Sequence, residues 1–214
     1  MHDVEAEDLF VRRLSDGNRA MLEAIAAYSE EEKASMLRTA ACEEAPYETL
    51  YRLTKEARSL LGGTIAFTMI HGGIAVNIMP KEVQLTANVR VGSVEKEAEV
   101  TKKLLQLAKK HDVLCELVSG VDAAPESRMD TPEYLAMKRS VEKTYPGLPI
   151  IPFVLGGGTD SRHFLEVTDQ VLRFSPMHAA PEQGRGVHGD NESAYIKDVE
   201  NAARCYYELL KHRL

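Results

Sequence analysis

The chain has 214 residues, of which 44% are hydrophobic and 28% charged, as in an ordinary soluble globular protein with one large or two small domains. Its formal charge of −7 argues against a nucleic-acid-binding protein, which normally presents a basic surface. No long apolar run or signal-peptide pattern occurs, and the three cysteines form no Cys-x-x-Cys pair, so we expect a cytoplasmic protein with neither nucleic-acid nor membrane partners.

The first 62 residues are predicted to be helical and irregular. Ser29 begins a capping-box pattern as the N-cap residue, with Glu32 three positions later. Pro46 suits the first turn of a further helix, which Gly62-Gly63 would end.

A change of period marks the following segment. Residues 64–70 are rich in β-branched and aromatic side chains, which predicts a strand, and Gly72-Gly73 predicts a turn or bulge. The apolar pattern resumes over residues 74–79. Residues 83–91 alternate strictly between apolar and polar side chains, which predicts a strand with Arg90 on its polar face.

A helix with apolar residues at helical spacing is predicted over residues 94–111, followed by a short strand over 113–118. Residues 46–119 therefore read α-β-β-α-β, which is a split βαβ, ferredoxin-like sheet lacking its first strand. The missing strand indicates a chain that begins inside a domain.

The last third of the chain alternates short strands and helices. The predicted elements are a helix from Thr131 to Tyr145 with Pro132 at its first position, a strand over 150–155, a helix opening over 159–164, a strand over 170–174 and a terminal helix from Ile196. Two strands alone do not make a stable sheet, so this half is predicted to belong to a larger β/α domain.

His188 is the first candidate for chemistry. It lies between two glycines and precedes Asp190, Asn191 and Glu192. Imidazole is a common zinc ligand, and Glu192 or Asn191 could orient it. The alternative is a polar loop before the last helix, and one histidine is short of the three protein ligands of a catalytic zinc.

Two further segments are candidates for substrate binding. The Gly-rich turn over residues 156–160 could present backbone N–H groups to an anion, although it lacks the P-loop ending; otherwise it is a tight turn. Arg90 with Asn77 would suit a substrate carboxylate through paired hydrogen bonds; otherwise Arg90 belongs to a solvated strand face.

Taken in order, these segments resemble the dizinc metallopeptidase and amidohydrolase family of aminoacylase, glutamate carboxypeptidase, carboxypeptidase S and acetylornithine deacetylase. The matching stretches are Thr64-Ile65-Ala66-Phe67-Thr68 through Gly72-Gly73, Asn77-Ile78-Met79-Pro80, Asn88-Val89-Arg90-Val91, Gly157-Gly158-Thr159-Asp160-Ser161-Arg162, Arg173-Phe174-Ser175-Pro176 and His188-Gly189-Asp190-Asn191-Glu192. The resemblance covers about residues 60–214, and residues 20–45 look like the helical insert of the carboxypeptidase S-like branch.

The resemblance implies an α+β architecture in three parts: a helical insert over residues 1–62, a dimerising lid sheet over 63–121 and the C-terminal part of the zinc-peptidase catalytic domain over 122–214. It implies a homodimer formed through the lid. The complete enzyme would hold two zinc ions, with His188 as one ligand. The substrate would be a small peptide or an N-acyl amino acid. Asn77 and Arg90 would hold its carboxylate, and Gly157, Gly158 and Thr159 its backbone.

The rest of the family's site, including the His-x-Asp motif, the bridging aspartate, the catalytic Glu-Glu pair and the lid histidine, has no counterpart in this chain. We therefore expect the C-terminal portion of a zinc-dependent hydrolase that cleaves an amide bond next to a free carboxylate, inactive by itself. The alternative is a non-catalytic dimerisation or interaction module derived from such an enzyme. The sequence upstream of residue 1 would discriminate between the two.

Overall fold

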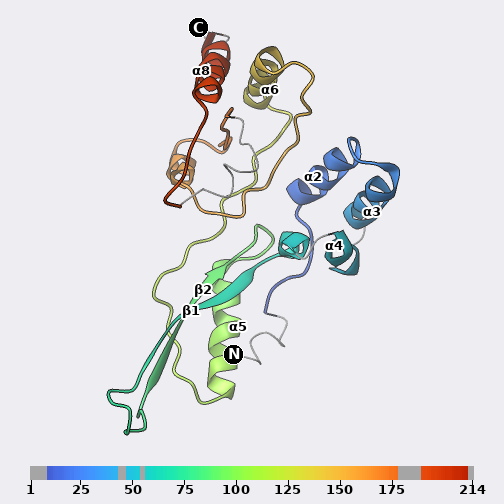
Figure 1. Ribbon diagram of the computed structural model, residues 1–214. Coiled ribbons are helices and arrows are strands. Elements are labelled where there is room, and N and C mark those ends of the chain that lie inside the picture. Colours follow the sequence, from blue (N-terminus) through green and yellow to red (C-terminus); the bar gives the residue numbers. More distant parts are fainter. Residues whose placement is uncertain (1–8, 43–46, 54–55, 178–188, 212–214) are drawn as a thin grey trace. The chain divides into compact units, whose positions relative to one another are not determined.

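The computed structural model describes residues 9–42, 47–53, 56–177 and 189–211, which form two compact units (Figure 1). The first unit spans residues 1–126 and the second residues 127–214. The finer division into three parts stays a prediction. Within the described residues, no helix has both the length and the apolar character needed to cross a membrane.

Four short helices open the described part of the first unit. They are α2 (Asp16–Ala26), α3 (Glu31–Cys42), α4 (Tyr47–Leu53) and the 3₁₀ helix η1 (Glu56–Leu61). Ser15 caps α2, because its hydroxyl accepts the Asn18 N–H at 3.1 Å. The helices enclose a small apolar core that includes Leu14, Leu22, Leu37, Leu50 and Leu61.

The capping role predicted for Ser29 is wrong. Helix α3 begins at Glu31, and the Ala34 N–H donates to the Glu30 carbonyl, one residue beyond the expected cap. The Ser29 hydroxyl instead donates to the Ile25 carbonyl at 3.0 Å and so closes the end of α2. A serine hydroxyl can serve either end of a helix, and here the preceding helix takes it.

A two-stranded antiparallel sheet follows, made of β1 (Thr64–Gly72) and β2 (Val83–Arg90). Helix α5 (Glu97–Lys110) covers one face, where Val100 and Leu107 are buried together with Phe10 and with inward-facing Ile65 and Val89. This mixture of helices with a small antiparallel sheet confirms the predicted fold class.

The apolar run over residues 74–79 does not continue β1, and the strand predicted over residues 113–118 is not formed. Residues 74–79 lie in an exposed loop that joins β1 to β2 and contains a turn closed by the Ile78 N–H and the Ala75 carbonyl. Residues 113–118 leave α5 through a Val113 N–H to Ala108 carbonyl bond and run back toward its N-terminus without ladder bonds to β1 or β2. In a split βαβ sheet this last strand pairs with the first strand, which the predicted order lacks.

The second unit contains α6 (Pro132–Thr144), the 3₁₀ helix η2 (Asp160–Glu166) and α8 (Ile196–Lys211). Thr131 caps α6 as predicted, accepting the Tyr134 N–H at 3.3 Å, with a proline in the first turn. Helices α6 and α8 pack together, and Ser140 and Cys205 are buried between them with Oγ and Sγ 3.6 Å apart.

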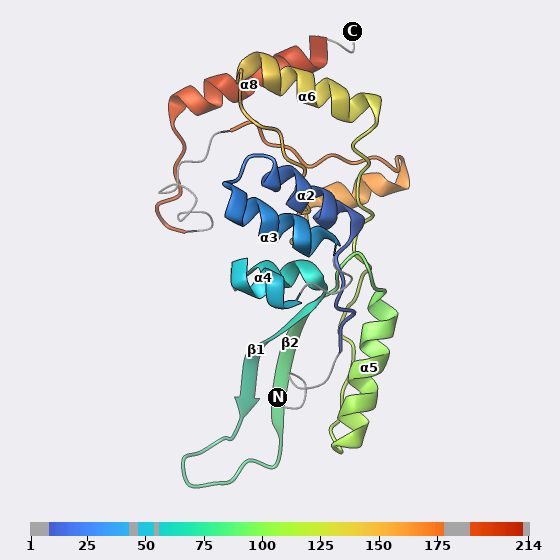
Figure 2. The ribbon, with the colours of Figure 1, turned by 90° about the vertical axis from the view of Figure 1, so that its right-hand side faces the viewer.

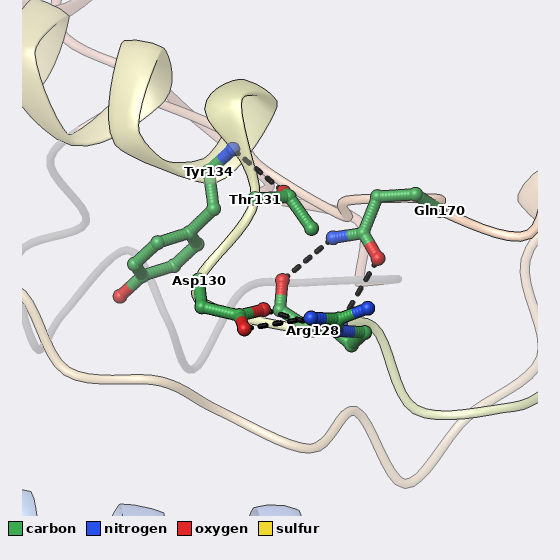
Figure 3. A network of polar contacts seen from close by, with 5 residues as sticks. All are labelled: Arg128, Asp130, Thr131, Tyr134 and Gln170. Atoms are coloured by element: carbon green, nitrogen blue, oxygen red, sulfur yellow. Dashed lines mark hydrogen bonds and ion pairs between the residues drawn. The ribbon is translucent and has the colours of Figure 1, made fainter.

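The strands predicted over 150–155 and 170–174 are absent from the described structure, where both segments are irregular. Side chains hold the second segment in place of a ladder (Figure 3). The backbone N–H of Arg128 donates to Gln170 Oε1 at 3.0 Å, and Gln170 Nε2 donates to the backbone carbonyl of Arg128 at 2.6 Å. The Ser127 hydroxyl donates to the Val171 carbonyl at 2.6 Å. Two strands alone cannot form a stable sheet, which accounts for the difference.

Candidate functional site

Arg90 is the last residue of β2 and lies on the sheet face opposite α5. Val89, its neighbour in the strand, packs against the α5 core, and successive side chains of a strand point to opposite faces. The strict alternation predicted this orientation. The Arg90 side chain is exposed, and Thr64 lies directly across from it on β1.

A polar band extends from Arg90 along this face. Asn88 lies two positions before Arg90 on the same face and pairs with Ala66 across the sheet. A bulge between Phe67 and Met69 shifts the pairing, so that Met69 and His71 complete the same face opposite Thr86 and Gln84. The sheet thus offers a solvent-facing surface with one permanent positive charge at one end.

Asn77 lies at the other end of the hairpin. It belongs to the exposed loop over residues 73–82, which both views show at the end of the hairpin farthest from α4 (Figures 1 and 2). Val83, where this loop meets β2, is seven residues from Arg90, which corresponds to about 23 Å of strand. The amide and the guanidinium expected to act together therefore do not meet within one copy of the chain.

The Gly-rich turn of the second unit leads into η2. The Arg162 N–H donates to the Thr159 carbonyl at 3.2 Å, and the hydroxyls of Thr159 and Ser161 are hydrogen-bonded to each other. A Cβ atom on Gly158 would lie 2.1 Å from Nη2 of Arg162, so the absence of a side chain lets the guanidinium lie over the turn. Gly157 has open space where a Cβ would be.

That turn carries no anion site on the strength of helix geometry alone, because η2 is a 3₁₀ helix of 7 residues rather than an extended α-helix. Its positive group is instead the Arg162 side chain, which the sequence-based predictions leave without a role. The spacing in the sequence could have indicated this contact, because Arg162 follows Gly158 by four residues, which is about one helical turn.

His188 lies outside the described residues. The structure resumes at Gly189, whose carbonyl accepts the Glu192 N–H at 3.3 Å and so closes a turn before α8. In the described part of the chain, no three His, Cys, Asp or Glu side chains lie close enough to hold a metal ion. These residues alone do not fit a zinc site.

Two exposed aspartates have lowered pKa values for structural reasons. The Glu97 N–H, followed by the Lys96 ammonium, holds the pKa of Asp122 below its usual range, and both groups lie at the start of α5. The guanidinium of Arg128 lowers the pKa of Asp130 through a two-pronged contact (Figure 3). The Asp122 carboxylate thus contacts the start of α5, and the Asp130 carboxylate pairs with Arg128 two residues before it.

Comparison with known proteins finds one family model and several relatives that match parts of the chain. Residues 15–114 match the model of the peptidase dimerisation domain. The chain is 28% identical over 151 residues to N-fatty-acyl-amino acid synthase/hydrolase PM20D1.1 of Danio rerio, covering 70% of this chain and 29% of that protein. It is 24% identical over 150 residues to probable carboxypeptidase S-like 2 of Dictyostelium discoideum, covering 70% and 29%.

A third relative is succinyl-diaminopimelate desuccinylase of Nitrosomonas europaea, with 26% identity over 146 residues that cover 68% of this chain and 37% of the relative. The matched region thus spans about a third of the length of these relatives. No solved structure matches the chain significantly. The matched residues 15–114 include α2, α3, α4, η1, the sheet and α5, so this part of the chain resembles the peptidase dimerisation domain, and the relatives that match it are named as hydrolases, a carboxypeptidase and a desuccinylase.

Proposed function

We propose that this chain forms the dimerisation domain and the C-terminal part of a zinc-dependent hydrolase that cleaves an amide bond next to a free carboxylate. The substrate class is a small peptide or an N-acyl amino acid. Relatives named as a carboxypeptidase and as an N-fatty-acyl-amino acid hydrolase support this class, since both names denote an amide bond beside a carboxylate. The cytoplasmic location expected from the sequence remains a proposal as well.

The observation that carries the proposal is the position of Arg90. Its guanidinium projects from an exposed polar sheet face, away from the helix that fills the opposite face. A guanidinium can bind a carboxylate through two parallel hydrogen bonds, which fixes the orientation of the bound acid as well as adding binding energy. Arg90 would therefore determine that the substrate carries a free carboxylate.

The remaining roles follow the family resemblance. His188 would be one zinc ligand, and Gly157, Gly158 and Thr159 would contact the substrate backbone, with Arg162 adding positive charge at that turn. Bound zinc supplies an activated water for hydrolysis. By the family resemblance, the other metal ligands belong to segments that have no counterpart in this sequence, so they would come from elsewhere in the polypeptide, and the 214-residue chain alone would be inactive.

A homodimer is part of the proposal. The match to a peptidase dimerisation domain supports it. About 23 Å of strand separates Arg90 from the loop that holds Asn77, so one copy cannot apply both side chains to one small carboxylate. If both contact the substrate, Asn77 would come from the second copy. Mixing the impaired Asn77→Ala and Arg90→Ala enzymes should then restore part of the activity, whereas Arg90→Ala alone should not recover.

A second candidate function is a non-catalytic dimerisation module. It is favoured by the family match, which covers residues 15–114 and is confined to the dimerisation domain. Such a module would dimerise without any dependence on zinc or on Arg90.

The deciding experiment compares two proteins with zinc present: the 214-residue chain and the polypeptide extended through any coding sequence upstream of Met1. The assay measures hydrolysis of N-acetyl amino acids. We expect no activity from the first and turnover from the second, which His188→Ala should abolish. Turnover by the 214-residue chain would contradict its proposed inactivity. An upstream sequence without His-x-Asp and Glu-Glu segments would favour the non-catalytic module.

A further inference from the structure

Asn88 is the amide-bearing side chain that the sheet brings near Arg90. The two residues are separated by one position on β2, so they project from the same face with Cα atoms about 6–7 Å apart. The Asn88 side chain is exposed. Asn77, at the far end of the hairpin, does not have this relation to Arg90 within one copy.

Thr64 completes the surroundings of Arg90 on this face. It is the residue directly opposite Arg90 in the register, and directly opposed residues of an antiparallel pair have Cβ atoms about 4.5–5.5 Å apart. Ala66, opposite Asn88, is small and leaves the amide accessible from the β1 side. One guanidinium, one carboxamide and one hydroxyl thus share a corner of the sheet without a bulky neighbour between them.

Asn88 has no evident structural task. Among the described residues its carboxamide has no hydrogen-bond partner, and it does not contribute to the apolar core beneath α5. Asparagine is disfavoured in strands, where β-branched and aromatic residues pack better. A residue type with low strand propensity, at an exposed strand position beside an arginine, is typical of a functional position.

We propose that Asn88 is a substrate-binding residue: its amide N–H₂ donates to the same carboxylate that Arg90 binds, and the Thr64 hydroxyl lies at the same corner of the sheet. This inference rests on the proposed role of Arg90. It assigns the amide donor of the carboxylate site within one copy to Asn88, whatever Asn77 contributes from another copy.

The test uses the 214-residue protein and needs no turnover. Isotope-labelled protein is titrated with N-acetylglycine and, separately, with its neutral counterpart N-acetylglycinamide, and binding is followed by NMR at the side chains of Asn88 and Arg90. The variants are Asn88→Leu, which keeps the shape and removes the donor, Arg90→Gln, and Gln84→Leu as a matched control. Gln84 is an exposed amide on the same face of β2, about 13 Å from Asn88.

We expect Asn88→Leu to weaken binding of the acid roughly tenfold, the scale for a lost hydrogen bond to a charged group, with little effect on the amide ligand. Gln84→Leu should bind as the unmodified protein does. Unchanged acid binding by Asn88→Leu, with the preference for the acid lost in Arg90→Gln, would refute this inference and leave the role of Arg90 intact. No preference for the acid in the unmodified protein would refute both. Equal weakening in Asn88→Leu and Gln84→Leu would also overturn the inference, since it would show a general disturbance of the strand.

Discussion

Replacing Gly63 with alanine should destabilise the first unit and disturb the end of β2 where Arg90 lies. An added Cβ would lie 2.3 Å from Cδ1 and 2.5 Å from Cε1 of Phe10, and 2.7 Å from the carbonyl oxygen of Arg90. All three distances are well inside van der Waals contact. The Phe10 ring is buried with Val100 and Leu107, so it cannot turn away without opening the core, and the Arg90 oxygen belongs to the backbone.

The expected cost is about 2–3 kcal/mol, at the upper end of the range for forcing a methyl group into a packed site. Urea unfolding followed by circular dichroism would report it as a lower midpoint with an unchanged slope. Gly157→Ala is the matched control, because nothing lies within 4 Å of its added Cβ, and its effect should stay below about 0.5 kcal/mol. In a Phe10→Leu background the cost of Gly63→Ala should fall, since the rigid ring is replaced by a smaller side chain that can turn, while the contact with the Arg90 carbonyl remains. A Gly63→Ala protein as stable as the Gly157→Ala control would refute the close packing at this junction.

Three further predictions concern the core, the start of α5 and the metal. Leu107→Ala, in the core beneath α5, should cost about 2–5 kcal/mol on unfolding, whereas Leu105→Ala, at a site 41% exposed on the same helix, should cost far less. Folding lowers the pKa of Asp122, so the ionised carboxylate stabilises the folded state at pH values above the ordinary aspartate pKa near 3.9. This stabilisation is lost as the pH falls through the lowered pKa of the folded state. Asp122→Asn should therefore flatten the acid side of a curve of unfolding free energy against pH. Calorimetric titration of the 214-residue protein with zinc should show no tight stoichiometric site, and a nanomolar two-ion site would contradict the proposed need for ligands from elsewhere.

Local patterns predicted those elements whose stability comes from neighbours in the sequence. The strand ending at Arg90 is set by strict alternation, helix α5 by apolar spacing, and the start of α6 by Thr131 and Pro132. Ser29 shows the limit of such rules, since its hydroxyl could serve either of two adjacent helices and the preceding one takes it.

The unformed strands depend on partners rather than on pattern. Residues 113–118 have the β-branched and apolar composition of a strand, yet they pair with neither strand of the described two-stranded sheet; in a split βαβ sheet their partner is the first strand, which the predicted order lacks. Residues 170–174 are held by side-chain amides and hydroxyls instead of a ladder.

The same limit applies to the candidate site. The alternation of residues 83–91 correctly predicted which face of the sheet Arg90 occupies. The distance between Arg90 and Asn77 depends on the length of the hairpin, which a sequence motif does not specify. The alternation also places Asn88 on the same polar face. Only the strand register, which puts Thr64 opposite Arg90 and the small Ala66 opposite Asn88, supports a place for Asn88 in the site.

The most direct test of the proposed function measures kcat/KM of the complete polypeptide with and without Arg90→Ala, on an N-acyl amino acid and on its neutral carboxamide. The proposal predicts a loss equivalent to about 2–4 kcal/mol for the acid, the usual cost of removing one partner of a buried charge pair, and little change for the carboxamide. Arg90→Lys should restore part of the loss, because it keeps the charge and not the two-pronged geometry. Full activity of Arg90→Ala on the acid would remove Arg90 from the site and contradict the proposed substrate class.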